Sequence, residues 1–225
     1  MDNIKLEKEI VNHKTVLLGI GNILVYLFVS MAFSLFEFND IRITYAFDVL
    51  SYIIIATLSI LFFRKRLKRD ITHIKENRSK YISEIVKNQL IMFILFMVAS
   101  FISVFLLKSD EQSVNQQAIE SLPTLMIFIS AVLYSPLVEE LVFRGSFRRF
   151  IKNDILFIII SGFVFGMLHT VMEASFIEAI IKGIPYITLG VYFAYLYVKT
   201  ENICISVICH FVHNFLAVML IFFFK

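Results

Sequence analysis

Two adjacent carboxylates with an arginine four residues further on are the most distinctive chemical feature of the sequence. Glu139 and Glu140 are followed by Arg144. On a helix, residues four apart share a face, so the Arg144 guanidinium can pair with the Glu140 carboxylate. Glu139 then points about 100° away from that pair. A Glu–Arg pair taken alone is more often structural than catalytic, but this one leaves a second carboxylate available.

Imidazoles and an amide recur at the same spacing in two later apolar runs. Phe165 and His169 are four residues apart, as are His210 and Asn214, while His213 lies one turn from His210 on an adjacent edge. Ionisable side chains within membrane spans are costly and are therefore functional candidates. A lone histidine in such a helix is more often an interhelical hydrogen bonder. Taken together, these polar side chains indicate a functional site.

A simple geometric test predicts that these groups meet. If two helices form an antiparallel hairpin that turns at residues 153–154, Glu139 and His169 each lie about 15 residues, or roughly 22 Å, from the turn. His210 and Asn214 lie roughly 12–18 Å along the last helix, which starts on the same side. We therefore expect four polar groups from three helices to converge in one layer, nearer the inner face than the outer.

The elements that must position these groups are membrane helices. Of 225 residues, 59% are hydrophobic and 17% are charged, and the mean hydropathy is +0.81. This composition excludes a soluble globular domain and a disordered chain. The fold class expected is all-α, a polytopic helical membrane protein of about seven transmembrane helices. The predicted spans are 15–36, 43–63, 86–107, 122–143, 155–170, 184–198 and 203–224.

Three local patterns refine the predicted helices. Pro136 removes a backbone donor just before the two carboxylates and predicts a kink there that opens room for water. Gly162 and Gly166 form a small-xxx-small face that permits close approach of another helix. Residues 171–183 are ambiguous, because Glu178 and Lys182 can pair on a helix but a glycine and a proline follow them. We interpret the segment as a short amphipathic or re-entrant helix. It would be an eighth helical element if it enters the bilayer.

The basic residues are sorted along the chain. With the N-terminus inside, 17 of the 21 Lys and Arg residues fall in inner segments, nine of them in a predicted loop at 64–87, three fall outside and Lys182 is unassigned. This bias predicts a cytoplasmic N-terminus. The same loop lacks interleaved aromatics apart from Tyr81, so we interpret it as an orientation signal that touches anionic lipid and predict no nucleic-acid partner. We divide the chain into an N-terminal membrane region (1–110) and a catalytic core (120–224).

The ordered trio of motifs resembles the CAAX-protease and bacteriocin-processing (CPBP) family, also called the abortive-infection family, of intramembrane proteases. The resemblance rests on Glu139-Glu140…Arg144, Phe165…His169 and His210…Asn214 and covers about residues 120–220. It implies that Glu139 is the general base that activates a water and that His169 orients this water or shares its proton. It further implies that Glu140 and Arg144 support the helix, with Phe165 beside them, and that His210 and Asn214 stabilise the oxyanion.

The same resemblance implies a class of substrate but does not decide whether the site binds a metal. Two histidines and a glutamate could hold zinc, but His-Glu-x-x-His is absent, and a glutamate-activated water explains the residues without a cofactor, so we favour no metal. The expected substrate is a hydrophobic or membrane-tethered peptide, cut near the cytoplasmic face of a bacterial plasma membrane. Pheromone or bacteriocin maturation, or immunity, is the implied role. The sequence makes no prediction of oligomeric state.

Two other functions are consistent with a small polytopic protein. A non-catalytic membrane scaffold that regulates a sensor kinase or an envelope enzyme would not need all four polar groups. A transporter would be expected to spread polar residues through the membrane depth or to carry paired broken repeats, and the sequence has neither. The intact motif set therefore favours the protease.

Overall fold

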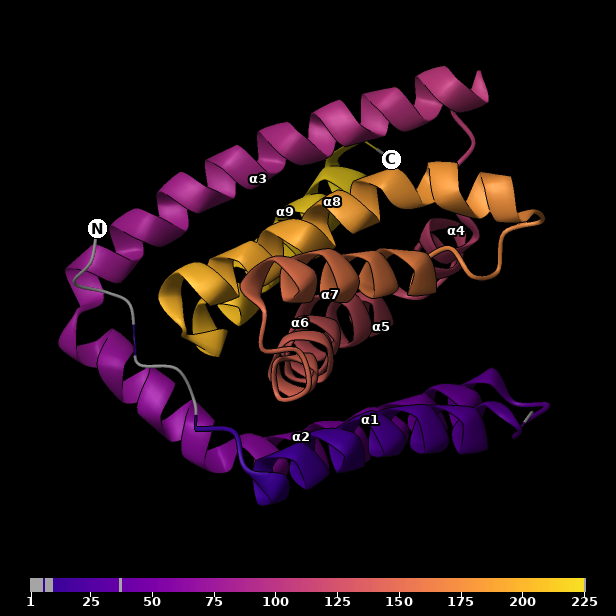
Figure 1. The fold of residues 1–225 in the computed structure, drawn as a ribbon. Coiled ribbons are helices and arrows are strands. Elements are labelled where there is room, and N and C mark those ends of the chain that lie inside the picture. Colours follow the sequence, from indigo (N-terminus) through magenta and orange to yellow (C-terminus); the bar gives the residue numbers. More distant parts are fainter. Residues whose placement is uncertain (1–5, 7–9, 37, 225) are drawn as a thin grey trace.

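The computed structural model describes residues 6, 10–36 and 38–224, and every regular element in this part of the chain is helical. Within these described ranges, six helical segments are long and apolar enough to cross a membrane, and a seventh apolar helix, α7, is shorter. The prediction of an all-α, polytopic membrane protein is therefore confirmed. Figure 1 shows the elements α1 (His13–Ser34), α2 (Ile41–Glu76), α3 (Arg78–Leu107), α4 (Val114–Glu120), α5 (Thr124–Ile127), η1 (Phe128–Tyr134), α6 (Ser135–Glu139), η2 (Glu140–Ser146), α7 (Asp154–Leu168), α8 (Phe176–Thr200) and α9 (Ile203–Phe224).

The basic segment 64–87, expected as a loop, is helical almost throughout, so that prediction was wrong. Helix α2 continues to Glu76 and α3 begins at Arg78, with Asn77 as the only break. Lys, Arg and Glu are strong helix formers, so a helix can continue after its apolar part has ended. Hydropathy marks only the part of a helix that suits lipid, which is why the expected spans were shorter than these two helices.

The segment that carries the two carboxylates is a single helical rod with changes of pitch. From Thr124 to Ser146, α5, η1, α6 and η2 follow one another without a gap. The elements η1 and η2 are π-helical, and the five residues of α6 lie between them. Wide turns of this kind occur frequently at functional sites. The rod is therefore irregular on both sides of Glu139.

Helix α8 is continuous, which corrects the expectation of a separate element at 171–183 and removes the eighth element. It begins at Phe176 and runs through Pro185 to Thr200. A proline inside a helix leaves the carbonyl four residues earlier without its N–H partner. Here that carbonyl, on Ile181, accepts a hydrogen bond from Ser103 Oγ of α3 at 2.9 Å. A neighbouring helix thus replaces the missing donor, as membrane helices allow.

Helices α7 and α8 pack at very short range, as the small-xxx-small pattern predicted. A Cβ added at Gly162 would lie 2.5 Å from the backbone nitrogen of Val191, and one at Gly166 would lie 2.5 Å from that of Ile187. A Cβ at Gly190 of α8 would in turn meet the Gly162 carbonyl oxygen at 2.6 Å. The two backbones are therefore in direct contact, and α8 fixes the position of α7.

The bundle has two chemically different ends. We call the end formed by residues 64–87, 144–153 and 199–202 the basic end, and the end formed by the α1–α2 turn, residues 108–123 and the α7–α8 loop the acidic end (left and right in Figure 1). Lys182 belongs to the acidic end, where it pairs with Glu178 at 2.9 Å and Glu173 at 3.0 Å. The other acidic side chains described at this end are Asp40, Asp110, Glu111 and Glu120.

The proposed division near residues 110–120 stays a prediction. Helix α3 packs along α8 and α9, and α1 packs against η2, so the two regions share extensive contacts.

Candidate active site

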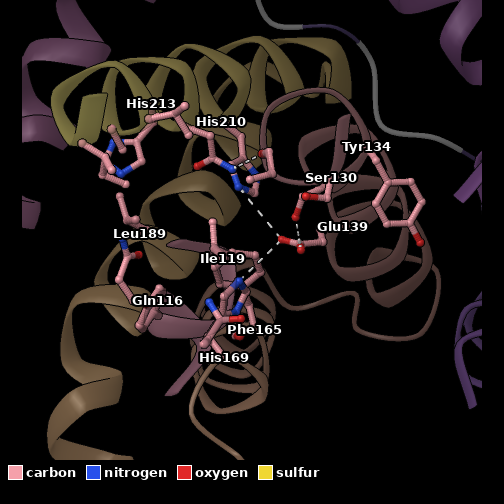
Figure 2. Close-up of a pocket in the computed structure, with 18 of the residues that line it drawn as sticks. Gln116, Ile119, Ser130, Tyr134, Glu139, Phe165, His169, Leu189, His210 and His213 are labelled. Carbon is pink, nitrogen blue, oxygen red and sulfur yellow. Dashed lines mark hydrogen bonds and ion pairs between the residues drawn. The ribbon is translucent and has the colours of Figure 1, made fainter. Parts of the chain in front are cut away.

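A cavity of about 280 Å³ lies between α4, the η1–α6 rod, α7, α8 and α9. Five of the residues singled out from the sequence line it: Glu139, Phe165, His169, His210 and Asn214. Figure 2 shows Glu139 between His210 and His169, with a dashed line to each. The convergence predicted from the hairpin geometry is therefore observed.

Glu139 presents one carboxylate oxygen to the cavity. Its Oε1 accepts a hydrogen bond from Ser135 Oγ, one turn earlier on the rod. Its Oε2 is buried and has no hydrogen-bond partner among the described residues. That oxygen lies 3.9 Å from His169 Nε2 and 4.0 Å from His210 Nε2. These distances are too long for direct hydrogen bonds. They suit a small molecule held between the three groups.

The two imidazoles are oriented through their other ring nitrogens. His169 Nδ1 lies 2.8 Å from the Phe165 carbonyl oxygen, which can only accept, so Nδ1 carries a proton. His210 Nδ1 lies 3.0 Å from Glu140 Oε1. The Glu140 carboxyl therefore fixes the orientation of the His210 ring. In the neutral ring, His169 Nε2 then directs a lone pair towards Glu139.

The Glu140–Arg144 pair forms the floor beneath the cavity. Both side chains are fully buried, and Arg144 Nη1 lies 3.1 Å from Glu140 Oε1. Arg144 Nη2 donates to the Gly190 carbonyl at 2.6 Å, and the guanidinium lies 4.6 Å from the Phe165 ring centroid. The predicted ion pair is therefore present, and it links η2 to α7, α8 and, through Glu140, to α9.

Asn214 donates a hydrogen bond to a backbone carbonyl that Pro136 leaves without a donor. In the π-helical register, Ser135 N–H pairs with the Ser130 carbonyl, five residues earlier. The next such donor would be the nitrogen of Pro136, which has no hydrogen. Its would-be acceptor, the Ala131 carbonyl, instead accepts from Asn214 Nδ2 at 2.8 Å. Asn214 therefore ties α9 to the rod and keeps one further N–H, which lies beside the cavity.

Two residues at the site were not singled out from the sequence. Ser135 lies four residues before Glu139, and this spacing could have revealed it. Tyr186 gave no signal, because it lies just beyond the segment that was ambiguous in the sequence. Its ring stacks on His169 at 4.9 Å between centroids, and its hydroxyl lies 2.9 Å from Ser113 Oγ. His213 also lines the cavity, with its ring edge-on to Phe96.

The expected depth of the site stays a prediction, because the three helices place their residues differently. Glu139 lies closer to Ser146 than to Thr124 along its rod, and His210 lies closer to the start of α9 than to its end. His169 is the C-cap of α7 and lies at the acidic end of that helix, outside the regular span. Asn115, Gln116 and Ile119 of α4, at the same end, also line the cavity. Helix α7 has only 15 residues, so a residue about 22 Å from the basic end is already at its far end. The cavity therefore extends from Glu139 and His210 towards the acidic end.

The donor set is of a kind that zinc accepts, since it combines two imidazoles and a carboxylate. However, no group of three or more His, Cys, Asp or Glu side chains within the described residues is arranged so as to hold a metal ion. That the site works without a metal stays a prediction.

Comparison with known proteins finds a family model that matches part of the chain. Residues 121–216 match the family model described as type II CAAX prenyl endopeptidase Rce1-like. This match contains every motif residue described above. Residues 121–216 are therefore similar to this family and are called the Rce1-like segment below.

Curated relatives also match part of the chain. The chain is 30% identical over 138 residues to the uncharacterized protein YyaK of Bacillus subtilis, covering 58% of this chain and 46% of that one. It is 27% identical over 110 residues to the UPF0177 protein YbdI of Lactococcus lactis, covering 49% of this chain and 57% of YbdI. It is also 27% identical over 130 residues to YdiL of Bacillus subtilis, named as a candidate membrane peptidase, covering 55% and 49%.

The matched lengths limit what can be concluded about this chain from its relatives. The chain spans about half the length of the curated relatives it matches. No solved structure gives a significant match. The Rce1-like segment and the apolar helices together indicate a multi-pass membrane protein that is related to membrane peptidases.

Proposed function

We propose that the chain is an intramembrane endopeptidase in which Glu139 activates a water for attack on a peptide bond. A water between the three groups donates one hydrogen bond to Glu139 Oε2 and the other to His169 Nε2, which leaves its oxygen lone pairs free to attack. Glu139 takes the proton as the carbon–oxygen bond forms. It then gives this proton to the leaving amine as the carbon–nitrogen bond breaks. The carboxyl of Glu139 thus ends the cycle ionised again.

The oxyanion that forms on the scissile carbonyl needs hydrogen-bond donors. We assign this role to the second N–H of Asn214 and to His210. In His210 the donor would be Nε2, the nitrogen on the side of Glu139, whereas Nδ1 faces Glu140. Glu140 and Arg144 act as positioning residues, because they hold His210 and the floor of the cavity without touching the reacting atoms. The reaction so described uses no metal or organic cofactor.

The proposed substrate is a hydrophobic or membrane-tethered peptide. The cavity is narrow, and its walls are largely apolar, with Leu189, Val218 and Ile221 beside the polar cluster. Such walls favour an apolar segment around the cleaved bond. Processing of peptide pheromones or bacteriocins, or immunity to them, in a bacterial plasma membrane would be a role of this kind.

The observation that carries the proposal is the position of Glu139 Oε2, buried, without a hydrogen-bond partner among the described residues and equidistant from two imidazoles. Comparative peptidomics of cells that express wild type, Glu139→Gln or Glu76→Gln tests it. Glu76 is an exposed carboxylate at the end of α2 and provides a matched control. We expect peptides that disappear in Glu139→Gln alone. A scaffold would give the same peptides in all three strains and keep the cellular phenotype.

A further inference from the structure

One histidine that lines the cavity takes no part in the reaction proposed above. His213 follows His210 by three residues on α9 and retains only 6% exposure. Its ring lies edge-on to Phe96 of α3, at 5.0 Å between centroids. Within the described part of the chain its ring nitrogens form no hydrogen bond, whereas one nitrogen of His169 and one of His210 each have a partner. His213 is therefore a buried polar side chain that has no polar partner among these residues.

Packing alone does not explain this imidazole. A histidine in a membrane helix ordinarily forms a hydrogen bond to a neighbouring helix. An apolar ring in place of the imidazole would pack on Phe96 equally well and would not bury two nitrogens away from water. Because His213 faces the cavity, a molecule that enters the cavity can supply the missing hydrogen bonds. The ring is therefore available to bind part of a substrate.

A glutamine of α4 lies on the same side of the cavity. Figure 2 shows His213 and Gln116 on the side away from Tyr134, with Leu189 between them. Gln116 Nε2 donates to Glu120 Oε1 at 2.8 Å, which leaves the amide oxygen as an acceptor. A neutral imidazole has one N–H donor and one acceptor nitrogen. We call His213 and Gln116 the polar patch, because together they can both donate and accept.

The polar patch lies a short distance from the reacting atoms. Three residues of helix separate His213 from His210, which corresponds to about 4.5 Å along α9. An extended peptide advances about 3.3–3.6 Å per residue. A peptide whose scissile carbonyl lies against His210 therefore presents to His213 a side chain that is one or two residues away from the cleaved bond.

The charges of the cavity decide which side chains the polar patch can accept. Among the described residues that line the cavity there is no Lys, Arg or Asp, and Glu139 is the only Glu. A carboxylate or an ammonium group at the patch would be desolvated without a counter-ion, because the Glu139 carboxylate is engaged by the attacking water. An amide or a hydroxyl carries no charge and can both donate and accept. Uncharged polar side chains therefore match the patch.

We propose that His213 and Gln116 select substrates that carry an uncharged polar side chain, an amide or a hydroxyl, one or two residues from the cleaved bond within an otherwise apolar segment. This inference rests on the proposed peptidase function and narrows its substrate class. A substrate without such a group leaves the imidazole of His213 unpaired in the complex. Sites built to hydrogen-bond a substrate group reject analogues that lack it.

Peptide binding tests the proposal without requiring cleavage. The probes are lysine-flanked peptides of leucine and alanine that differ only at one central residue, which is leucine, glutamine or glutamate. Full-length protein with Glu139→Gln is held in lipid nanodiscs, so that peptide cleavage does not disturb the measurement. It is compared with the same protein carrying in addition His213→Phe or His213→Asn. The first keeps a ring that packs on Phe96 and removes both nitrogens, and the second keeps a donor and an acceptor.

We expect the Glu139→Gln protein to bind the glutamine peptide roughly 10- to 100-fold more tightly than the leucine or glutamate peptide, which is the range for a buried polar group that gains a partner. Adding His213→Phe should remove this preference by tightening the binding of the leucine peptide, and adding His213→Asn should retain most of it. Equal affinities in the Glu139→Gln protein, an unchanged preference in His213→Phe, or a loss of binding of both peptides in His213→Phe would overturn the proposal.

Cleavage of the same peptides separates this inference from the peptidase function. Protein with the native Glu139 is incubated with them, and the product masses locate the cut, which we expect within two residues of the glutamine. Cuts further away would overturn the proposed selection. Peptides that all stay intact would contradict the peptidase function, whereas the binding preference and its loss in His213→Phe report on the polar patch in either case.

Discussion

Gly166→Ala should impair catalysis through helix packing alone. The added Cβ would lie 2.5 Å from the Ile187 nitrogen and 2.6 Å from its Cα, whereas ordinary contact begins at 3.4 Å. Because the obstacle is backbone, α7 must move away from α8 by roughly 0.9 Å, the difference between these contacts. His169 follows Gly166 by three residues and moves with it. A misplacement of about 1 Å can cost about 100-fold in rate, and overpacking costs about 1–3 kcal/mol in stability.

Two assays separate these effects. Rate is measured with a quenched fluorescent peptide built on a cleavage site found by peptidomics, and stability is measured by thermal unfolding in detergent. Gly21→Ala is the matched control, because its Cβ would meet the Phe62 ring at an ordinary 3.6 Å. A helical Gly→Ala change without a clash should be neutral or stabilise by up to about 1 kcal/mol. Wild-type rate and stability in Gly166→Ala would refute the argument from packing.

Three further outcomes follow from the site. Arg144→Met should lower the free energy of unfolding by about 3–5 kcal/mol, because it leaves the Glu140 carboxylate buried without its cation. Adding Glu140→Gln should recover part of this loss, as measured by chemical denaturation. Tyr186→Leu removes a ring stack worth about 0.5–1.5 kcal/mol, so kcat should fall by up to about tenfold while Tyr186→Phe keeps most of it. Peptide cleavage should survive EDTA and a permeant phenanthroline chelator, with the non-chelating isomer as control; abolition by the chelator alone would require a metal in the mechanism.

The site was predictable from the sequence to a large extent because its residues repeat at helical spacing. The i,i+4 pairs placed Glu140 with Arg144 and His210 with Asn214 on single faces, and the turn at 153–154 brought Glu139 opposite His169. The contact of Gly166 with α8 follows from the small-xxx-small pattern in the same way. These are local rules that need no knowledge of the rest of the fold.

The remaining features depend on contacts between segments that are distant in the sequence. Pro185 continues a helix only because Ser103 occupies the freed carbonyl, and that contact joins α3 to α8. Tyr186 reaches His169 only because α8 is continuous there. His169 lies at the very end of its helix only because α7 ends at Leu168, before a full membrane span is complete.

The role of Glu139 is the central claim, and isotope transfer tests it most directly. Purified wild type, Glu139→Gln and Glu76→Gln are reconstituted in lipid nanodiscs and given the peptide in water enriched in oxygen-18. We predict that wild type and Glu76→Gln place one labelled oxygen in the new C-terminal carboxylate, while Glu139→Gln is slower by about 100-fold or more, as loss of a general base requires. Cleavage by Glu139→Gln at the wild-type rate would contradict the account.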